Sequence, residues 1–86
     1  MFKVIFEQKR ENQIRLQGIG YKNAMQACNV SVGQHIIWNF GSTSLILDIT
    51  PTKSGKSYNI TTKSETGYVS TNRYAATRLL AIEELN

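Results

Sequence analysis

Two side chains in this sequence have the chemistry of a nucleophile and its base. They are Cys28 and His35, each the only residue of its type. A cysteine beside a histidine can act as a nucleophile, but an active pair also needs a third group that orients the imidazole, and none is evident. The pattern instead favours Cys28 as a small core residue on a helix and His35 as an outward-facing strand residue. One cysteine and one histidine are also too few to hold a zinc ion.

The acidic residues and the glycine motifs do not complete a catalytic or nucleotide-binding site. The acids that could form an acid–base pair fall at polar strand or turn positions, where solvation is the ordinary role: Glu7, Glu11, Asp48 and Glu65. Gly55-Lys56-Ser57 matches the end of a phosphate-binding loop, but Thr50 stands where the first glycine belongs, and 57–61 alternates like a strand. Gly18-Ile19-Gly20 lacks the spacing of a dinucleotide fingerprint and predicts a turn. The sequence therefore predicts no enzyme, no cofactor and no metal site.

Basic residues dominate the second half of the chain. Ten Lys and Arg against six Asp and Glu give a formal charge of +4, which mildly favours anionic partners. From 50 to 82 the only acid is Glu65, and five cations are interleaved with tyrosines: Lys53, Lys56, Lys63, Arg73 and Arg78, with Tyr58, Tyr68 and Tyr74. Cations beside aromatic rings can hold a nucleic-acid backbone and stack its bases, so we predict a nucleic-acid-binding surface here. The alternative is that the tyrosines fill a thin core and the lysines keep the loops soluble.

A protein partner is the second hypothesis. A small β domain exposes strand edges, and an edge can accept a partner strand or form a homodimer. Trp38, the only tryptophan, shares an apolar face with Ile36 and Phe40 and is predicted to be core, with an interface role as the alternative. Under this hypothesis the chain is a protein-binding module or an inhibitor of a host enzyme or defence complex.

The elements that must position these residues are mainly short strands separated by turns. Alternating apolar residues predict strands over 2–7, 13–17, 34–40, 44–50, 57–61 and 68–74. The spacing of apolar residues between Ala24 and Cys28 predicts a short helix over 21–29. The segment 74–85 fits either a helix or a turn followed by a strand over 79–83, and its two terminal glutamates favour the strand. The predicted core consists of Ile36, Trp38, Phe40, Leu45, Leu47 and Ile49.

The chain of 86 residues is expected to form one mainly β domain over 1–86. We predict a β-rich α+β fold, a small barrel or bent sheet of about five to six strands with one short helix at about 21–29. A single cysteine allows no internal disulfide. The sequence shows neither a signal peptide nor an apolar run long enough for a membrane span, so a cytoplasmic location is expected.

Several segments together resemble small proteins of phages and prophages that have Src-homology-3-like barrels. The segments are VGQHIIWNFG, LILDI, KSGKSYNI, ETGYVSTNRY and RLLAI, between Val32 and Ile82. Gln34 departs from the pattern, which has Asp there, and the STNRY segment is less basic than in that family. The resemblance implies a barrel of the Src-homology-3 type, an origin in a mobile element and residence in a host cytoplasm. It implies no activity, because small barrels host many functions.

Overall fold

The computed structural model describes residues 13–83, and their regular structure consists mainly of strands. The mainly β prediction is therefore confirmed. In chain order the elements are β1 (Gln13–Leu16), β2 (Gly20–Gln26), the 3-10 helix η1 (Ala27–Asn29), β3 (His35–Ile37), the 3-10 helix η2 (Asn39–Gly41), β4 (Thr43–Pro51), β5 (Ser57–Ser64), β6 (Val69–Ala75) and β7 (Leu79–Ala81).

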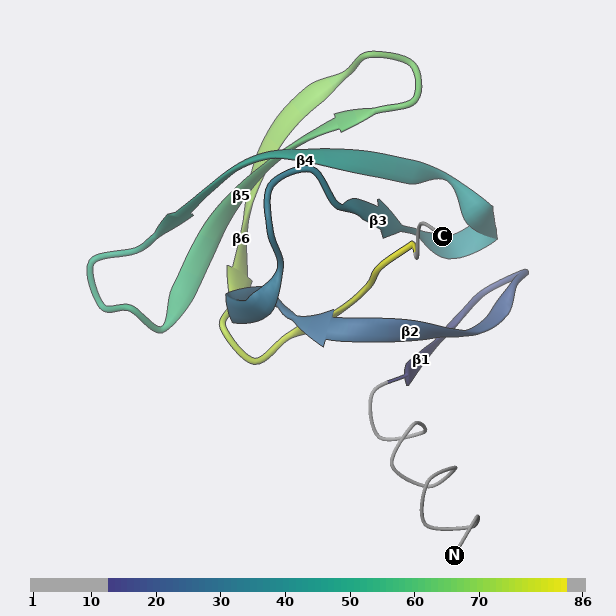
Figure 1. The fold of residues 1–86 in the computed structure, drawn as a ribbon, viewed down its shortest axis with the longest axis horizontal. Coiled ribbons are helices and arrows are strands. Elements are labelled where there is room, and N and C mark those ends of the chain that lie inside the picture. The colour runs from purple at the N-terminus through teal and green to yellow at the C-terminus, as the bar shows by residue number, and fades with distance from the viewer. Residues whose placement is uncertain (1–12, 84–86) are drawn as a thin grey trace, which may run out of the picture.

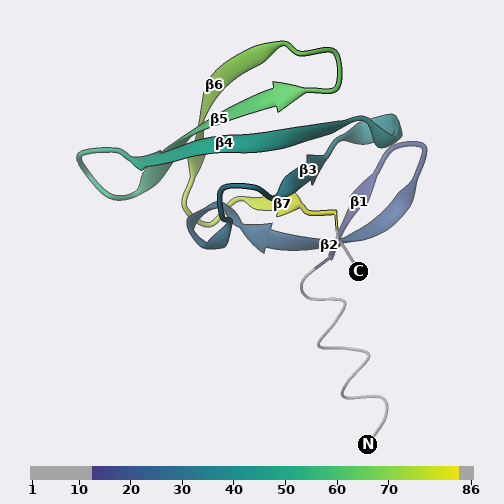
Figure 2. The ribbon, with the colours of Figure 1, turned by 45° about the horizontal axis from the view of Figure 1, so that its top comes forward.

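The strands form two antiparallel sheets that lie one above the other (Figures 1 and 2). One sheet has the order β1-β2-β7 and the other β3-β4-β5-β6. The sheets touch along β7 and β3, where Ile36 and Ile82 form an isolated bridge and the Glu83 amide donates to the His35 carbonyl over 2.9 Å. The described strands thus form two sheets joined at this bridge and not a closed barrel, which the bent-sheet form of the prediction allows.

The main core lies between the two sheets. Its fully buried members are Ile36, Ile46 and Ile60, which come from three neighbouring strands of the larger sheet. Tyr74 joins the same cluster from β6 of the larger sheet, and Ala27 and Leu80 join it from η1 and β7. Because strands pack through alternate residues, Ile60 and Thr62 face this core while Thr61 and Lys63 face outward. The larger sheet therefore has one apolar face and one solvent-exposed face.

The predicted helix over 21–29 is wrong for most of its length. Residues 20–26 form β2, and only Ala27–Asn29 turns as a 3-10 helix. β2 pairs with β1 on one side and with β7 on the other, with Ala24 directly opposite Ala81. The backbone hydrogen bonds of these two pairings stabilise β2 more than the local helix propensity of 21–29 would stabilise a helix. The predicted turn at 18–20 is confirmed as the connection between β1 and β2.

Part of the predicted core faces water because of two local irregularities. In β4, Ser44 and Ile46 face the core, and the β4–β5 register then shifts between Ile46 and Asp48 at a β-bulge, where Leu47 is 40 % exposed. β3 ends at Ile37, so Trp38 is half-buried and Phe40 lies in a turn, 75 % exposed and at a φ of 66°. Of the remaining members, Ile36 is confirmed in the core, and Leu45 and Ile49 are half-buried.

The end of the chain follows the strand alternative. A turn at 76–77 leads into β7, which confirms the turn-and-strand prediction over the helix. β4 ends at Pro51, and β5 and β6, which correspond to the strands predicted over 57–61 and 68–74, form an antiparallel hairpin. The strand predicted over 2–7 and the acids Glu7 and Glu11 lie outside the described residues.

Candidate nucleic-acid interface

The predicted binding residues are spread along β5 and β6 and do not form a single compact cluster. Lys53 and Lys56 are exposed in the β4–β5 loop, on the left of Figure 1. Lys63 and Tyr68 lie at the opposite end of β5, and Tyr68 is 70 % exposed. Lys63 lies seven positions after Lys56, which corresponds to about 23 Å along an extended strand. The set therefore marks out an extended surface.

The β4–β5 loop is a hydrogen-bonded turn that holds its two lysines on a fixed tip. The Thr52 amide donates to the Ser57 carbonyl over 3.0 Å, and the Thr52 hydroxyl donates to the same oxygen over 3.1 Å. Inside the turn, the Gly55 amide donates to the Thr52 carbonyl over 2.9 Å. The loop leads into β5 and not into a helix, so Gly55-Lys56-Ser57 lacks the setting of a phosphate-binding loop, as the sequence predicts.

The outer face of the β5–β6 hairpin combines cations with hydroxyl and amide groups. Directly paired residues share a face, and three pairs lie on the outer one: Lys63 with Val69, Thr61 with Thr71, and Asn59 with Arg73. The Thr61 and Thr71 hydroxyls are hydrogen-bonded to each other at 2.7 Å. We use the name β5–β6 basic face for these three pairs together with Lys53 and Lys56 of the adjoining loop. The neutral polar members Asn59, Thr61 and Thr71 were not predicted from the sequence. The alternation of 57–63 does place Asn59 and Thr61 on the same face as Lys63.

The acids near this face are bound to threonines and not to the cations. Asp48 is the acidic side chain that β4 contributes to the outer face, and it accepts a hydrogen bond from the Thr50 hydroxyl over 3.1 Å. Glu65 accepts from both the Thr43 amide and the Thr43 hydroxyl, over 3.1 and 2.9 Å. Within residues 13–83 the side chains of Lys53, Lys56, Lys63 and Arg73 have no hydrogen-bond or ion-pair partner. These cations remain free to meet an anion.

Comparison of the chain with family models, curated proteins and solved structures gave no match. The resemblance to small phage proteins therefore stays a prediction from the motifs. No helix within residues 13–83 is both long enough and apolar enough to cross a membrane.

Tyr58 and Tyr74 face the core, and Arg78 is exposed in the turn between β6 and β7. Tyr74 is buried in the main core, and the half-buried Tyr58 pairs with it across the hairpin and packs on the same cluster. The Arg78 guanidinium carbon lies 5.5 Å from the centre of the Tyr74 ring, a cation–π distance. Among the tyrosines predicted to bind, Tyr68 is thus the one that presents its ring to solvent.

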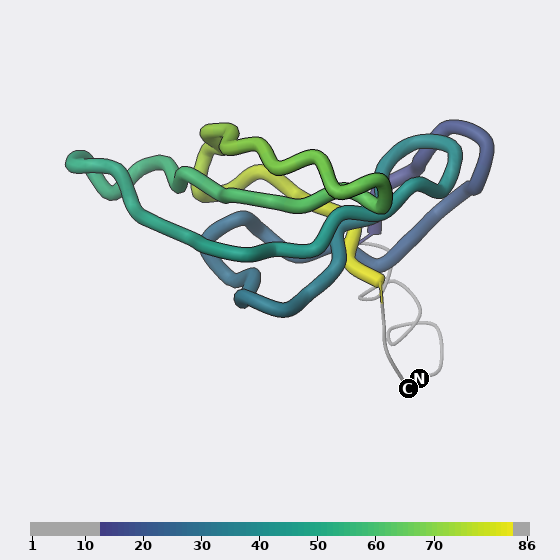
Figure 3. Tube along the Cα trace, turned by 90° about the horizontal axis from the view of Figure 1, so that it is seen from above, coloured from purple at the N-terminus to yellow at the C-terminus, as the bar shows by residue number. Residues whose placement is uncertain are grey.

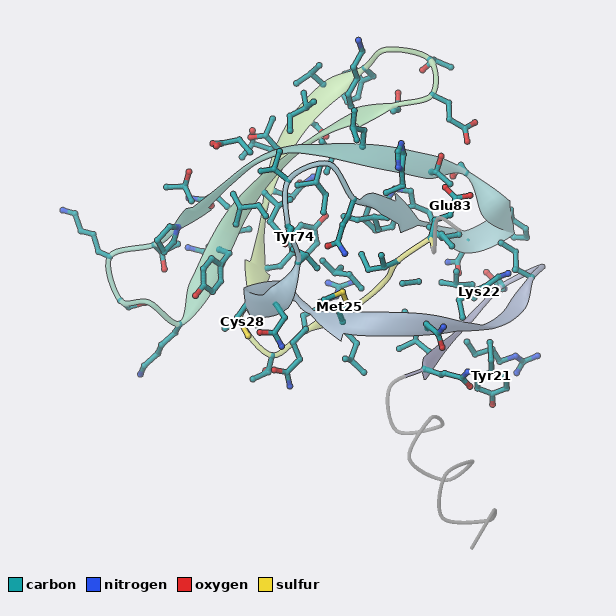
Figure 4. The ribbon with its side chains drawn as sticks, viewed as in Figure 1. Tyr21, Lys22, Met25, Cys28, Tyr74 and Glu83 are labelled. Carbon is teal, nitrogen blue, oxygen red and sulfur yellow. The ribbon has the colours of Figure 1, made fainter. Side chains whose placement is uncertain are left out.

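Burial raises the pKa of the Tyr74 hydroxyl above its usual range, and the Arg78 charge and the Asn72 side chain oppose this effect. Burial disfavours the charged phenolate, whereas a nearby cation favours it. The net rise means that the folded chain holds this proton to a higher pH than the unfolded chain does. Figure 4 shows Tyr74 between the two sheets.

Raising the pH above the ordinary tyrosine pKa of 10.0 is expected to weaken the fold through Tyr74. The unfolded chain loses the proton first, so the contribution is complete below that value and disappears as the pH rises through the folded-state pKa. Urea unfolding at about pH 8 and about pH 11 measures the effect. Tyr74→Phe should flatten the pH dependence, and Tyr68→Phe, at an exposed turn, should not. An unchanged dependence in Tyr74→Phe would contradict this assignment.

Cys28 and His35 have separate surroundings. Cys28 is exposed on η1, so the prediction of a buried helical cysteine is wrong, and its Sγ lies 3.6 Å from the Gln26 side-chain oxygen (Figure 4). His35 is half-buried on β3, opposite Leu45, and its Nδ1 has no hydrogen-bond partner. No group of three or more His, Cys, Asp or Glu side chains that could hold a metal ion lies within the described part of the chain.

A groove of about 200 Å³ lies between β1, β3 and β7. Its walls include Ile14, Trp38 and Leu80, and its polar side chains are Asn39 and Arg78. The Trp38 ring is held in place because its Nε1 donates to the Ser44 hydroxyl over 2.9 Å. With so few polar groups to orient a ligand, the groove is a weaker candidate than the β5–β6 basic face.

Proposed function

We propose that this protein binds the sugar–phosphate backbone of a nucleic acid on the β5–β6 basic face. The observation that carries the proposal is that Lys63 and Arg73 lie on the outer face of the β5–β6 hairpin and Lys53 and Lys56 lie in the adjoining β4–β5 loop. Within residues 13–83 none of the four has an ion-pair partner. Contacts between cations and phosphates supply most of the affinity of proteins that bind nucleic acids without sequence preference. The hydroxyl and amide groups between the cations are the donors that commonly contact phosphate and sugar oxygens.

The shape of the face favours backbone contact over reading of bases. A surface about 23 Å long spans roughly seven nucleotide steps of about 3.4 Å. Base pairs are distinguished by a helix or a two-stranded ribbon inserted into the major groove, whereas the cations proposed here lie on the broad face of a sheet, which suits contact with the backbone. Tyr68 offers one exposed ring in the turn that precedes β6, where an unpaired base could stack. In line with the resemblance to phage proteins, the proposed setting is the cytoplasm of a bacterial host.

Removing two cations from the face is expected to weaken binding and to change its salt dependence. The variant Lys63→Gln/Arg73→Gln should bind a duplex about 10- to 100-fold more weakly at about 0.1 M salt. The slope of log affinity against log salt should become shallower by about 2, because each lost phosphate contact removes about 0.9. Fluorescence anisotropy with a labelled duplex and a labelled single strand, over a series of salt concentrations, measures both quantities.

The matched control removes the same charge from the other sheet. Arg15 and Lys22 are exposed on β1 and β2, and Figure 4 labels Lys22. Arg15→Gln/Lys22→Gln should keep most of the affinity and of the salt slope. Equal losses in the two variants would mean that net charge alone drives binding, and the β5–β6 basic face would be rejected. No binding of either nucleic acid at low salt would overturn the proposal in favour of a protein partner.

A further inference from the structure

β6 is an open edge of the larger sheet. It pairs with β5 on one side, and among the described elements it makes extensive contacts with β5 alone. The views in Figures 2 and 3 agree that it lies at the outside of the β4–β5–β6 layer. An open edge presents a row of backbone donors and acceptors that a further strand can use.

The hydrogen bonds at the two ends of the hairpin show which β6 groups point to the open side. The Ser64 amide donates to the Tyr68 carbonyl over 2.8 Å, and the Ala76 amide donates to the Lys56 carbonyl over 2.9 Å. Antiparallel pairs alternate between hydrogen-bonded and non-hydrogen-bonded, so the even-numbered residues of β6 bond to β5. The N–H and C=O groups of Val69, Thr71 and Arg73 therefore face outward, away from β5.

This edge lacks the features that usually protect a strand from pairing. Over Val69–Ala75 there is no proline, the register with β5 is continuous, and Arg73 is the single charge. By contrast, the edge strands β1 and β3 are only four and three residues long, and β7 bridges to β3. Long, regular and weakly charged edges are the ones that associate.

We propose that β6 pairs antiparallel with β6 of a second copy of this chain, about a two-fold axis at Thr71. In this register Thr71 lies opposite Thr71 of the second copy, and Val69 lies opposite its Arg73. The outward groups of Val69, Thr71 and Arg73 then all find partners, each pair exchanging two hydrogen bonds. The proposal does not depend on nucleic-acid binding.

The side chains favour a second copy because the register is self-complementary. Val69 is 52 % exposed, and the aliphatic stem of Arg73 from the second copy would cover it. The two Arg73 side chains lie four residues apart along the paired strands, so no like charges are directly opposite. A two-fold contact also uses up both edges, so association stops at the dimer. The two larger sheets become continuous, and their basic faces lie on the same side.

Charge changes at Val69 test this register. Val69→Glu places a carboxylate opposite Arg73 of the second copy and should tighten the dimer about 2- to 10-fold, and Val69→Lys should weaken it by a similar factor. Adding Arg73→Glu to Val69→Glu should cancel the gain. Sedimentation velocity over about 1–500 µM protein, with no nucleic acid present, measures the dimer constants, since a small interface gives micromolar affinity.

A proline on the open side provides an independent variant. The Thr71 amide points away from β5, so Thr71→Pro should abolish the dimer and retain the fold, as checked by circular dichroism. A wild-type chain that stays monomeric throughout the concentration range would overturn the proposal. A dimer that responds equally to Val69→Glu and Val69→Lys would also overturn it, since another surface or register would then be responsible. Because no nucleic acid is used, neither result bears on the proposed function.

Discussion

Replacing Ile46 by alanine is expected to lower the free energy of unfolding by about 2–5 kcal/mol. The Ile46 side chain is 1 % exposed and packs with Ile36 and Ile60 at the centre of the main core. Truncation removes buried methyl and methylene groups and leaves a cavity that the surrounding strands fill only in part. Small domains have a total stability of about 5–15 kcal/mol, so a large share would be lost. Urea unfolding followed by Trp38 fluorescence would measure the change.

Leu47 is the matched control because it is the next residue in the same strand. It is 40 % exposed, so Leu47→Ala should cost less than about 1 kcal/mol. An uninterrupted alternation that buries Leu45, Leu47 and Ile49, as predicted from the sequence, would make Leu47→Ala the more destabilising of the two changes. If Leu47→Ala proved the more damaging change, the bulge between Ile46 and Asp48 would be contradicted, together with the assignment of the outer face.

The bulge explains why the sequence predicted the strand but not its buried face. Ser44 and Ile46 point inward before the bulge, and Ile49 is turned toward the core after it. Alternation starting from Leu45 therefore places Ile49 correctly and Ile46 incorrectly. The extra residue is accommodated by pairing with β5, and nothing in 43–51 marks its position. The register between strands depends on tertiary contacts, so the alternation within one strand does not show where a bulge will lie.

The helix predicted over 21–29 is a strand in the structure for the same reason, since pairing with distant residues decides its conformation. Ala24, Met25 and Ala27 have spacings that suit one turn of helix as well as a strand. The deciding contacts come from Leu79–Ala81, more than fifty residues further along the chain. Ala24 and Ala81 are both small, and both are buried where β2 meets β7. Local propensity gives way when pairing on both edges satisfies the backbone.

The charged residues of the candidate site could be predicted from the sequence, but the neutral polar residues beside them and the exclusion of Arg78 could not. Lys63 and Arg73 could be chosen from sequence because acids are scarce around them. Their place on one face with Thr61 follows from the pairing of β5 with β6, in which Asn59 meets Arg73. Arg78 could not be separated from the set by sequence, since its contact with Tyr74 depends on the turn between β6 and β7.

Replacing Gly18 by alanine is expected to destabilise the fold by about 1–3 kcal/mol. Gly18 has a φ of +80°, where an L-residue is strained, and a Cβ there would lie 2.7 Å from the Cδ1 atom of Phe40. Gly55 has a similar φ of +75°, but its Cβ would meet no atom within 4 Å. Gly55→Ala therefore measures the backbone strain alone, and the difference in unfolding free energy between the two variants measures the contact with Phe40.

The contact matters because Gly18 and Phe40 belong to turns of different sheets. The Phe40 amide donates to the Gln17 carbonyl over 2.7 Å, and the Gln17 amide donates to the Asn39 side-chain oxygen over 2.8 Å. Figure 3 shows the β1–β2 and β3–β4 turns side by side. In the double variant Gly18→Ala/Phe40→Ala the clash is gone, so the coupling energy should be about 1 kcal/mol, in the sense that the double variant is more stable than the sum of the single changes predicts. Additive effects would contradict this contact.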